Sequence, residues 1–321
     1  MSDVGCAGIL VEDTFCGPIA ALPTEGALLV LDDMPVKAGG CAANVAIDLT
    51  KQGISAEVAG CVGRDSGAGV LVETLKACGV GCSRVVPVEA YPTSKTVILL
   101  IAGQDRRYLH VPGANCAFTT DHIARDWLSQ LKVFYFGGLF ALPGFNPHKL
   151  ADLLRFCRST KVTTVVDVVV PQGLSGMAQL QPLLPLIDVF VPNEDEARAF
   201  TGITDPFDQL KTFVSAGANT VIITRGRLGC VAARRGKIWS CGAYQMSVVD
   251  PSGSGDAFTS GVITSLLREW DLPKTLRYAS VIGASATRAT GTTDSVFSTA
   301  EAEAFLRGHP LTMTERESQW T

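Results

Sequence analysis

The alternation of short β-branched segments with longer helical segments is the sequence feature that most constrains the fold. From about residue 40 onward, runs rich in valine, isoleucine and threonine are separated by stretches with helical periodicity. Strands are expected at residues 56–62, 133–136, 163–167, 189–191 and 220–224. Helices are expected at residues 43–52, 67–78, 120–131, 147–159, 194–200, 206–216, 255–270 and 273–290. This order is typical of a mostly parallel sheet with helices on both faces, so we predict an α/β sandwich.

Two segments break this alternation, because they contain strand-like and turn-like residues without a helix between them. These segments are residues 13–36 and residues 93–111, and the second contains an apolar run at 96–101. We expect both to form a small antiparallel β-sheet that stands off the main domain and acts as a lid over a cleft. The tail after Gly308 is polar and is expected to be loosely held. The main domain would then comprise residues 1–12, 37–92 and 112–321.

The composition indicates a soluble globular protein. Of the 321 residues, 47% are hydrophobic and 18% are charged, which excludes disordered and coiled-coil classes. The net charge of −4 argues against a protein that coats nucleic acid or anionic membranes. The chain shows no signal-like leader and no membrane-length apolar run, so a cytoplasmic location is expected. The ten cysteines, spread from Cys6 to Cys241 without metal-site spacing, are expected to be reduced and buried.

The densest functional signal is the segment 250–258, Asp-Pro-Ser-Gly-Ser-Gly-Asp-Ala-Phe, which leads into an apolar helical pattern. Gly253 and Gly255 permit close approach of a ligand to the backbone, and the N–H groups at a helix start favour an anion. A carboxylate at Asp256 beside such an anion suits a base that takes a proton from a hydroxyl, which then attacks phosphorus. The alternative is a helix-start aspartate that interacts only with the helix dipole.

This segment resembles the Asp-Thr-x-Gly-Ala-Gly-Asp signature of the ribokinase-like (PfkB) carbohydrate kinase family. The resemblance implies a Rossmann-like three-layer α/β/α sandwich with a β-sheet lid. It also implies an enzyme that uses ATP to phosphorylate a hydroxymethyl group of a small sugar. Further segments resemble the family in order and spacing, over roughly residues 5–306: Gly39-Gly40-Cys41-Ala42-Ala43-Asn44, residues 63–67, 112–115 and 193–196, and Thr224-Arg225-Gly226-Arg227-Leu228-Gly229.

The resemblance implies roles for residues on the nucleotide side of the site. Asp256 would be the catalytic base, and the N–H groups of Gly253, Ser254 and Gly255 would form the anion hole. Asn193 and Glu196 would hold Mg²⁺ and the phosphates, with Glu196 acting through water because magnesium keeps its hydration shell. The alternative to this ligand-binding role is that the pair only forms an ordinary helix start after a strand. The residues that would approach the nucleotide itself are Thr224, Gly226 and Gly229.

On the acceptor side, the resemblance implies contacts from Gly39, Gly40 and Asn44 at the start of the first helix. Asp13 falls where the family places a carboxylate that binds two sugar hydroxyls, and its alternative is a solvated turn residue. Many relatives also bind a monovalent cation beside the anion hole, which implies K⁺ activation here. By position, the cation site would comprise Asp250, Ser252, Ala286, Ala289, Gly291 and Ser295.

Several departures from the family pattern concern the acceptor. Pro251 and Ser254 replace threonine and alanine in the signature, but neither removes an N–H group from the anion hole. Cys41 stands where ribokinases usually have lysine, and Val11 where they often have asparagine. Residues 135–139 offer no carboxylate where ribokinases supply one to the sugar, so ribose is disfavoured as the substrate. The two lid arginines, Arg106 and Arg107, are expected to be solvated charges at a sheet edge, and the alternative is that they contact a phosphate or carboxylate of the acceptor.

Two alternatives to a sugar kinase remain open. A nucleoside kinase of the same fold would need an apolar slot for the base, and a silent relative would bind sugar or nucleotide as a regulator. A dehydrogenase and a Walker-type ATPase are disfavoured because their glycine motifs are missing from the sequence. The apolar run at 96–101 would leave a lid face that needs cover, so we expect a homodimer paired through the lid.

Overall fold

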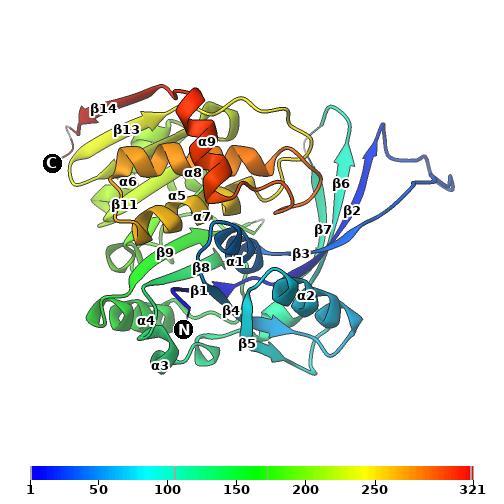
Figure 1. Ribbon diagram of the computed structural model, residues 1–321. Coiled ribbons are helices and arrows are strands. Elements are labelled where there is room, and N and C mark those ends of the chain that lie inside the picture. Colours follow the sequence, from blue (N-terminus) through cyan, green and yellow to red (C-terminus); the bar gives the residue numbers. More distant parts are fainter. Residues whose placement is uncertain (1, 105, 172, 319, 321) are drawn as a thin grey trace.

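A large sheet runs through the main body of the molecule in this computed structural model, which describes residues 2–104, 106–171, 173–318 and 320 (Figure 1). Its strand order is β14-β13-β12-β11-β10-β9-β8-β1-β4-β5. The strands from β5 to β11 are parallel, and β12, β13 and β14 add antiparallel pairs at the other edge. The strands are β1 Val4–Gly8, β4 Ala56–Val62, β5 Gly81–Pro87, β8 Val133–Leu139, β9 Thr163–Val168, β10 Val189–Phe190, β11 Thr220–Thr224, β12 Cys230–Arg234, β13 Lys237–Cys241 and β14 Met313–Glu317.

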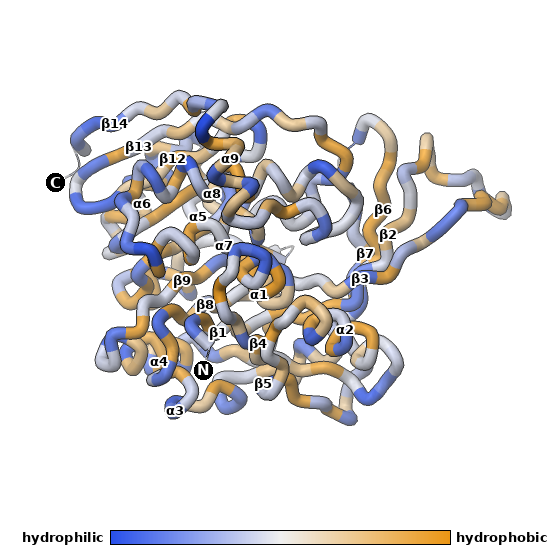
Figure 2. Tube along the Cα trace, in the orientation of Figure 1, coloured by the Kyte–Doolittle hydropathy of each residue, from blue (hydrophilic) through white to orange (hydrophobic). Residues whose placement is uncertain are grey.

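Helices cover both faces of this sheet, as predicted. Successive residues of a strand point to opposite faces. Phe134 and Phe136 therefore pack with one helical layer, and Val133 and Tyr135 with the other. Hydrophobic residues follow the inner strands in Figure 2. The first layer contains α3 Arg125–Leu128, α4 Pro147–Ser159, α5 Glu194–Thr201 and α6 Pro206–Ser215. The second layer contains α1 Cys41–Lys51, α2 Ser66–Ala77, α7 Ser254–Leu267 and α8 Leu272–Ala286. The last helix, α9 Thr299–Gly308, packs on α8.

A smaller sheet stands off the body at the right of Figure 1. Its order is β3-β2-β6-β7, from β3 Val36–Gly39, β2 Val11–Ile19, β6 Lys95–Ile101 and β7 Arg107–Val111. The expectation of an antiparallel sheet is wrong for its central pair, because β2 and β6 run parallel. The physical reason is that β2 follows the core strand β1 and β6 follows the core strand β5. Both core strands point the same way, so the chain enters the lid twice in the same direction.

Three other expectations need correction. The helix expected at 120–131 is a 3₁₀ turn, Thr120–His122, and the short α3, because Thr119 caps the turn and Ala124 is extended. The tail is not loose along its whole length, since β14 pairs with β13. All ten cysteines are free thiols, but only half of them are fully buried. Among the described residues, every helix is too short or too polar to cross a lipid bilayer.

The contact between α1 and α7 contains buried polar groups that the hydrophobic pattern did not indicate. Asp48 of α1 is fully buried, and neither of its carboxylate oxygens has a hydrogen-bond partner among the described residues. One turn later, the Gln52 amide donates to Ser260 of α7 at 2.8 Å. Burial raises the pKa of Asp48 well above its usual value, with a further contribution from the Asp256 charge. Burial without a hydrogen-bond partner in the described part of the chain thus favours the protonated form of Asp48 in the folded protein.

We predict that Asp48→Asn makes the protein more stable at pH 8 than the wild type. The unfolded chain releases the Asp48 proton above about pH 4, whereas the folded protein keeps it, so wild-type stability falls as pH rises. The gain should grow by up to about 1.4 kcal/mol per pH unit. Urea unfolding between pH 5 and 8 measures it, with the exposed Asp152→Asn as control. Parallel stability curves for Asp48→Asn and wild type would refute a neutral Asp48.

Candidate active site

The start of α7 forms an open anion site in the backbone. Gly253 precedes the helix with a φ of 75°, and a Cβ there would lie 2.1 Å from the Thr292 carbonyl oxygen, so only glycine fits. Within the described part of the chain, no side chain caps this helix start. At Gly255 the space where a Cβ would lie is empty, and the residue is exposed. The Gly255 N–H can therefore bind an anionic ligand at the positive end of the helix dipole, together with the Ser254 N–H, whose hydrogen bond to the Pro251 carbonyl is long at 3.4 Å.

Asp256 lies in the first turn of the same helix, and α1 fixes its carboxylate. The Asn44 side-chain amide donates to Asp256 Oδ2 at 2.8 Å, and Thr292 Oγ1 donates to Asn44 Oδ1 at 2.8 Å. Burial raises the pKa of Asp256, while the hydrogen bonds from Asn44 and Cys41 oppose the rise. A held carboxylate with a raised pKa beside an anion site has the chemistry of a general base.

A second buried carboxylate, Asp167, faces this base and was missed in the sequence. Oxygen atoms of Asp167 and Asp256 and the Cys41 sulfur lie within 4.8 Å of one another. Asp167 accepts hydrogen bonds from the Tyr135 hydroxyl and the Gly138 N–H. Burial and the Asp256 charge raise its pKa well above the usual value. The available signal was position alone, because Asp167 lies at the C-terminal end of a parallel strand, where α/β proteins bind ligands.

The residues expected on the acceptor side come together from the lid and α1. Asp13 of β2 is only 6% exposed, and burial raises its pKa to about 7. Gly39 ends β3 so close to it that a Cβ would lie 1.8 Å from Asp13 Oδ2. Gly40 then begins α1 with a φ of 92°. Asp13 is near enough to Asp256 for the two charges to interact, so the expected acceptor residues face the expected base.

The two lid arginines differ in their surroundings. Arg107 is exposed and donates to the Gln104 side chain at 2.6 Å, which agrees with a solvated edge charge. Arg106 is only partly exposed, donates to the Tyr108 hydroxyl, and its charge lowers the pKa of Asp256. Arg106 therefore contributes to the electrostatic field of the site.

The expected nucleotide residues lie at the ends of neighbouring strands. Asn193 and Thr224 form a bridge between the chain segments after β10 and at the end of β11. Beyond β11, the turn closes where the Arg225 N–H donates to the Gly229 carbonyl at 2.8 Å. Gly229 has a φ of 84°, and a Cβ there would lie 2.0 Å from the Cys241 carbonyl oxygen. Gly226 begins this turn with free space around it.

Asn193 and Glu196 form a reciprocal cap at the start of α5. The Glu196 N–H donates to Asn193 Oδ1 at 2.9 Å, and the Asn193 N–H donates to Glu196 Oε2 at 2.8 Å. Burial raises the pKa of Glu196 to about 8, opposed by this hydrogen bond, and the Asp256 charge adds to the rise. Clustered carboxylates of this kind fit a hydrated divalent cation, because the cation offsets their mutual repulsion.

The residues expected at the monovalent cation site form two hydrogen-bonded groups, one around Asp250 and one around Ser295. Asp250 is fully buried and accepts from the N–H groups of Ser252 and Gly291. Ser252 Oγ is buried without a hydrogen-bond partner among the described residues, which fits a ligand atom for a cation. The Ser295 hydroxyl donates to the Ala286 carbonyl at 3.0 Å, and Ala289 lies between Ala286 and Gly291 in the chain.

Arg288 is a feature of this cation region that the sequence pattern did not indicate. Its guanidinium donates to the Ser295 carbonyl at 2.6 Å and to the Ser285 carbonyl at 3.1 Å. A bound cation that used the Ser295 carbonyl would have to share it with this side chain. The donor set therefore fits a monovalent cation at Asp250 and Ser252 better than at Ser295.

Comparison with known proteins identifies the family. Residues 19–299 match a protein family described as "pfkB family carbohydrate kinase". The chain belongs to the PfkB family of carbohydrate kinases. Ribokinase of Haemophilus influenzae is 24% identical over 287 residues, which cover 88% of this chain and 91% of that protein. ATP-dependent 6-phosphofructokinase of Thermoanaerobacterium thermosaccharolyticum is 24% identical, over 79% of this chain and 80% of that one.

A solved structure supports the fold of this family member. It is a protein from E. coli classed as ribokinase II, in complex with ATP and Mg²⁺. Its identity is 19% and its TM-score 0.81, over 96% of this chain and 100% of the other. The predicted family, the α/β sandwich with a lid and the carbohydrate kinase class are confirmed. The two named relatives act on different acceptors, so family membership leaves the acceptor open.

We predict that Gly39→Ala impairs use of the carbohydrate while ATP use is retained. The new Cβ would overlap the Asp13 carboxylate and displace it. Misplacement on this scale costs about 10²-fold in kcat/KM for the acceptor. Steady-state kinetics with each substrate varied in turn measures the effect. Gly69→Ala in α2 is the matched control, because a Cβ there meets nothing within 4 Å. An equal loss for both substrates would contradict a role confined to the acceptor.

Proposed function

We propose that the protein transfers the γ-phosphoryl group of ATP to a hydroxymethyl group of a small sugar, with Asp256 as base. The observation that carries this proposal is the position of the Asp256 carboxylate. It is held by Asn44 and lies one turn into a helix whose start is uncapped and open to an anion. A base and an anion hole on the same helix are what phosphoryl transfer to an alcohol requires.

In the proposed reaction, the acceptor hydroxyl gives its proton to the Asp256 carboxylate while its oxygen attacks the γ-phosphorus. The bond from that phosphorus to the β–γ bridging oxygen breaks, and ADP leaves. The N–H groups of Gly253, Ser254 and Gly255 would stabilise the negative charge on the transferred group. Because the Asn44 amide donates to Oδ2 of the Asp256 carboxylate, it would orient the base toward the acceptor.

The groups around the base favour a neutral acceptor with several hydroxyls. Asp13 and Asp167 can each accept hydrogen bonds from hydroxyl groups, and both lie near Asp256. We propose that Asp167 supplies the acceptor-side carboxylate that residues 135–139 lack. Three carboxylates would repel an acceptor phosphate, although Arg106 partly offsets their charge. This acidic surface suits a sugar better than the base of a nucleoside.

Mg²⁺ would neutralise the phosphates of ATP and supply positive charge where the transferred group develops negative charge. In this proposal Glu196 holds it through water and Asn193 faces the phosphates, while Thr224, Gly226 and Gly229 contact the nucleotide. K⁺ at Asp250 and Ser252 would support the loop that leads into the anion hole, with Ala286, Ala289, Gly291 and Ser295 nearby. The cytoplasmic location stays a prediction.

The proposal predicts that Asp256→Asn abolishes acceptor-dependent ADP release. Loss of a general base lowers kcat by about 10²–10⁴-fold. ADP release is measured with Mg-ATP over pentoses, hexoses, ketoses, sugar acids and nucleosides, in KCl and in choline chloride. Asp152→Asn, a surface substitution in an exposed ion pair, is the matched control. Calorimetric binding of ATP to both variants confirms that the site is still formed.

The outcomes of this assay separate the candidate functions. Turnover with a sugar that vanishes in Asp256→Asn supports the proposal, and turnover confined to nucleosides would make the protein a nucleoside kinase. ATP binding without turnover on the whole panel would favour the silent regulator. Equal rates in KCl and choline chloride would refute K⁺ activation, and would fit the guanidinium that Arg288 places on the Ser295 carbonyl.

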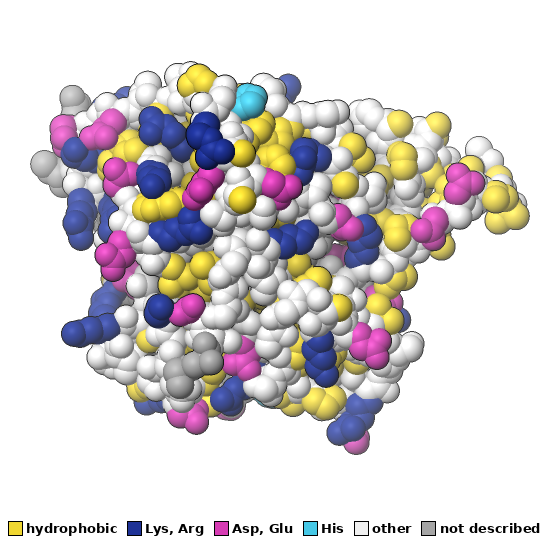
Figure 3. Space-filling view, in the orientation of Figure 1, with side chains coloured by type: hydrophobic (Ala, Val, Ile, Leu, Met, Phe, Trp, Pro, Cys, Tyr) yellow, Lys and Arg dark blue, Asp and Glu magenta, His cyan; other side chains and the backbone are white. Residues whose placement is uncertain are grey.

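We also propose a homodimer formed through the lid. The outer lid strand β7 exposes Leu109 at 62% and Val111 at 52%, and the loop between β2 and β3 exposes Leu28 at 89%. Hydrophobic side chains gather on this projecting part of the surface in Figure 3. Exposed apolar side chains on two elements of the lid are typical of a protein contact.

The dimer proposal predicts a mass of twice 33.9 kDa by light scattering at about 10 µM protein. Leu109→Lys should shift the population to the monomer, because it places a charge in the proposed contact. Val70→Lys is the matched control, since Val70 is exposed on α2, outside the lid strands. A monomeric wild type at this concentration would contradict the proposal.

A further inference from the structure

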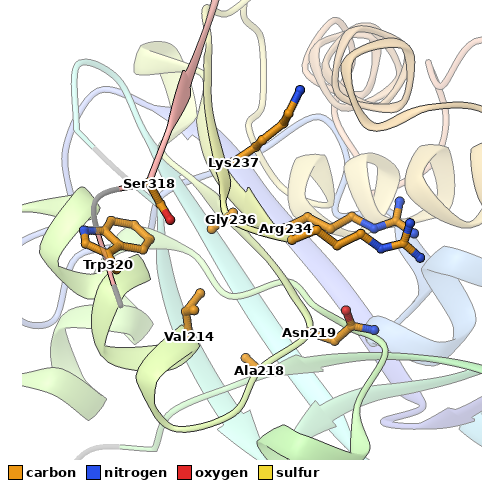
Figure 4. A pocket seen from close by; sticks show the side chains of 10 residues that line it. Val214, Ala218, Asn219, Arg234, Gly236, Lys237, Ser318 and Trp320 are labelled. Carbon is orange, nitrogen blue, oxygen red and sulfur yellow. The ribbon is translucent and has the colours of Figure 1, made fainter.

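The cavity in Figure 4 separates its charged groups from its aromatic ring, so it does not suit one small ligand. It lies between the β12–β13 hairpin, α6 and the chain end, with a volume of about 270 Å³. The Arg234 side chain points away from Trp320 and Val214. Arg235, in the hairpin turn, is exposed. A more continuous set of polar contacts lies in the lid, on the acceptor side of the active site.

A row of three polar side chains crosses the lid sheet. Asp13 of β2 is the register partner of Thr96 in β6, and Thr96 is the register partner of His110 in β7. Register partners on neighbouring strands point to the same face of a sheet, and such strands lie about 4.8 Å apart. The three side chains therefore lie side by side, across the lid strands that Figure 1 shows next to one another.

This face of the lid is the one turned to the active site. Asp13 and Thr96 are only 6% and 8% exposed, and Asp13 interacts electrostatically with Asp256 of α7. His110 lies on the outer strand of the sheet and is exposed. The row thus runs from solvent at the lid edge to the carboxylate that we expect to bind the acceptor.

Hydrogen bonds connect the three groups. Thr96 Oγ1 lies 3.0 Å from His110 Nδ1. The Thr96 hydroxyl also bonds to the Asp13 carboxylate, and this bond opposes the larger effect of burial, which raises the pKa of Asp13. A threonine hydroxyl has one proton, so it can donate to only one of its two neighbours. The directions of the two hydrogen bonds are therefore coupled.

A charged Asp13 permits only one of the two directions. A carboxylate can only accept, so Thr96 donates to Asp13 and its oxygen accepts from a protonated Nδ1 of His110. A protonated Asp13 permits the reverse direction, in which Nδ1 carries no proton. A proton on His110 Nδ1 therefore favours the charged form of Asp13, although the two side chains are on strands that do not pair.

Two other charged groups lie around Asp13. Lys37 of β3 is the register partner of Asp13 on its other side, but the Lys37 Nζ atom lies 2.9 Å from Asp294 Oδ1. The Asp256 charge raises the pKa of Asp13 and so disfavours its ionisation. Thr96 is therefore the neighbour that favours a charged Asp13.

The surroundings of His110 keep its ring neutral near pH 7. Partial burial lowers the pKa of His110 below its usual value. Tyr108, two residues away on the same face of β7, is hydrogen-bonded to Arg106. The proton that His110 offers to Thr96 near pH 7 is therefore that of a neutral tautomer, with Nδ1 protonated.

We propose that His110 is a positioning residue, which acts through the Thr96 hydroxyl to hold the Asp13 carboxylate charged and oriented for the acceptor. This inference rests on the proposed role of Asp13 in binding the acceptor. A charged carboxylate that accepts from Thr96 with one lone pair keeps other lone pairs for sugar hydroxyls.

NMR of the full chain tests this row without any substrate, by the titration midpoint of the Asp13 carboxyl carbon. Asp13→Asn identifies the signal. His110→Phe and Thr96→Val should each raise the midpoint by about 0.5 pH unit, because one hydrogen bond of ordinary strength shifts a pKa by up to about one unit. His110→Asn, whose amide can donate in place of Nδ1, and Thr96→Ser should keep the wild-type midpoint. His148→Phe, at an exposed histidine on α4, is the matched control.

Kinetics then tests the effect on the acceptor, with the sugar of the panel above that gives the highest rate. At pH 7, KM for the sugar should be about twofold higher in His110→Phe, because Asp13 titrates near this pH and less of it is charged in the variant. At pH 9 the KM values should converge, since Asp13 is then charged in both proteins. KM for ATP should be unchanged at both pH values, and His110→Asn should behave as the wild type.

These outcomes separate the inference from the proposed function. An Asp13 midpoint that neither His110→Phe nor Thr96→Val changes, in variants that thermal melts show to be folded, would overturn the hydrogen-bonded row. A shifted midpoint with an unchanged sugar KM at pH 7 would overturn the positioning role. If no sugar is phosphorylated, the proposed function fails, whereas the NMR midpoints still show whether His110 acts on Asp13.

Discussion

The hydrogen bond between Asn44 and Asp256 is the interaction on which the site depends, because it joins two helices that each begin at a strained glycine. A Cβ at Gly40 would lie 2.5 Å from the Ile9 carbonyl oxygen, and one at Gly253 would lie 2.1 Å from the Thr292 carbonyl oxygen. Both helix starts are therefore packed against other backbone with no room for a side chain. This close packing brings a side chain from α1 within 2.8 Å of a carboxylate on α7, although the two residues are 212 positions apart.

Acidic groups dominate the electrostatic field of the site, and burial disfavours their charged forms. Asp13, Asp167, Asp256 and Glu196 all have raised pKa values, and in each case burial is the largest cause. Asp13, Asp167 and Glu196 also interact electrostatically with Asp256. Such a cluster is least stable when it is empty and charged, and it becomes more stable when hydroxyl donors or a cation bind. Ligand binding and the protonation of the site are thus thermodynamically linked.

Much of the fold and part of the site followed from local sequence patterns. The strands at 56–62 and 220–224 and the helix at 147–159 have the predicted bounds, because β-branched runs and amphipathic periodicity are strong local signals. Asp167 was not found, since a single aspartate at a strand end has no motif, and only tertiary packing brings it to Asp256. The parallel pairing of β2 with β6 depends on the direction of core strands far away in sequence. β14 was missed because its residues are polar and its pairing partner is distant.

The connection between the lid and the core is unusually short. β3 ends at Gly39 and α1 begins at Cys41, so Gly40 is the sole residue between them. Asp13 lies on the lid strand β2, whereas Asn44 lies one turn into α1. Because only Gly40 lies between β3 and α1, we expect a tilt of the lid to move the first turn of α1. In the proposed mechanism, Gly40 would be one hinge between the lid that carries Asp13 and the helix whose Asn44 holds Asp256.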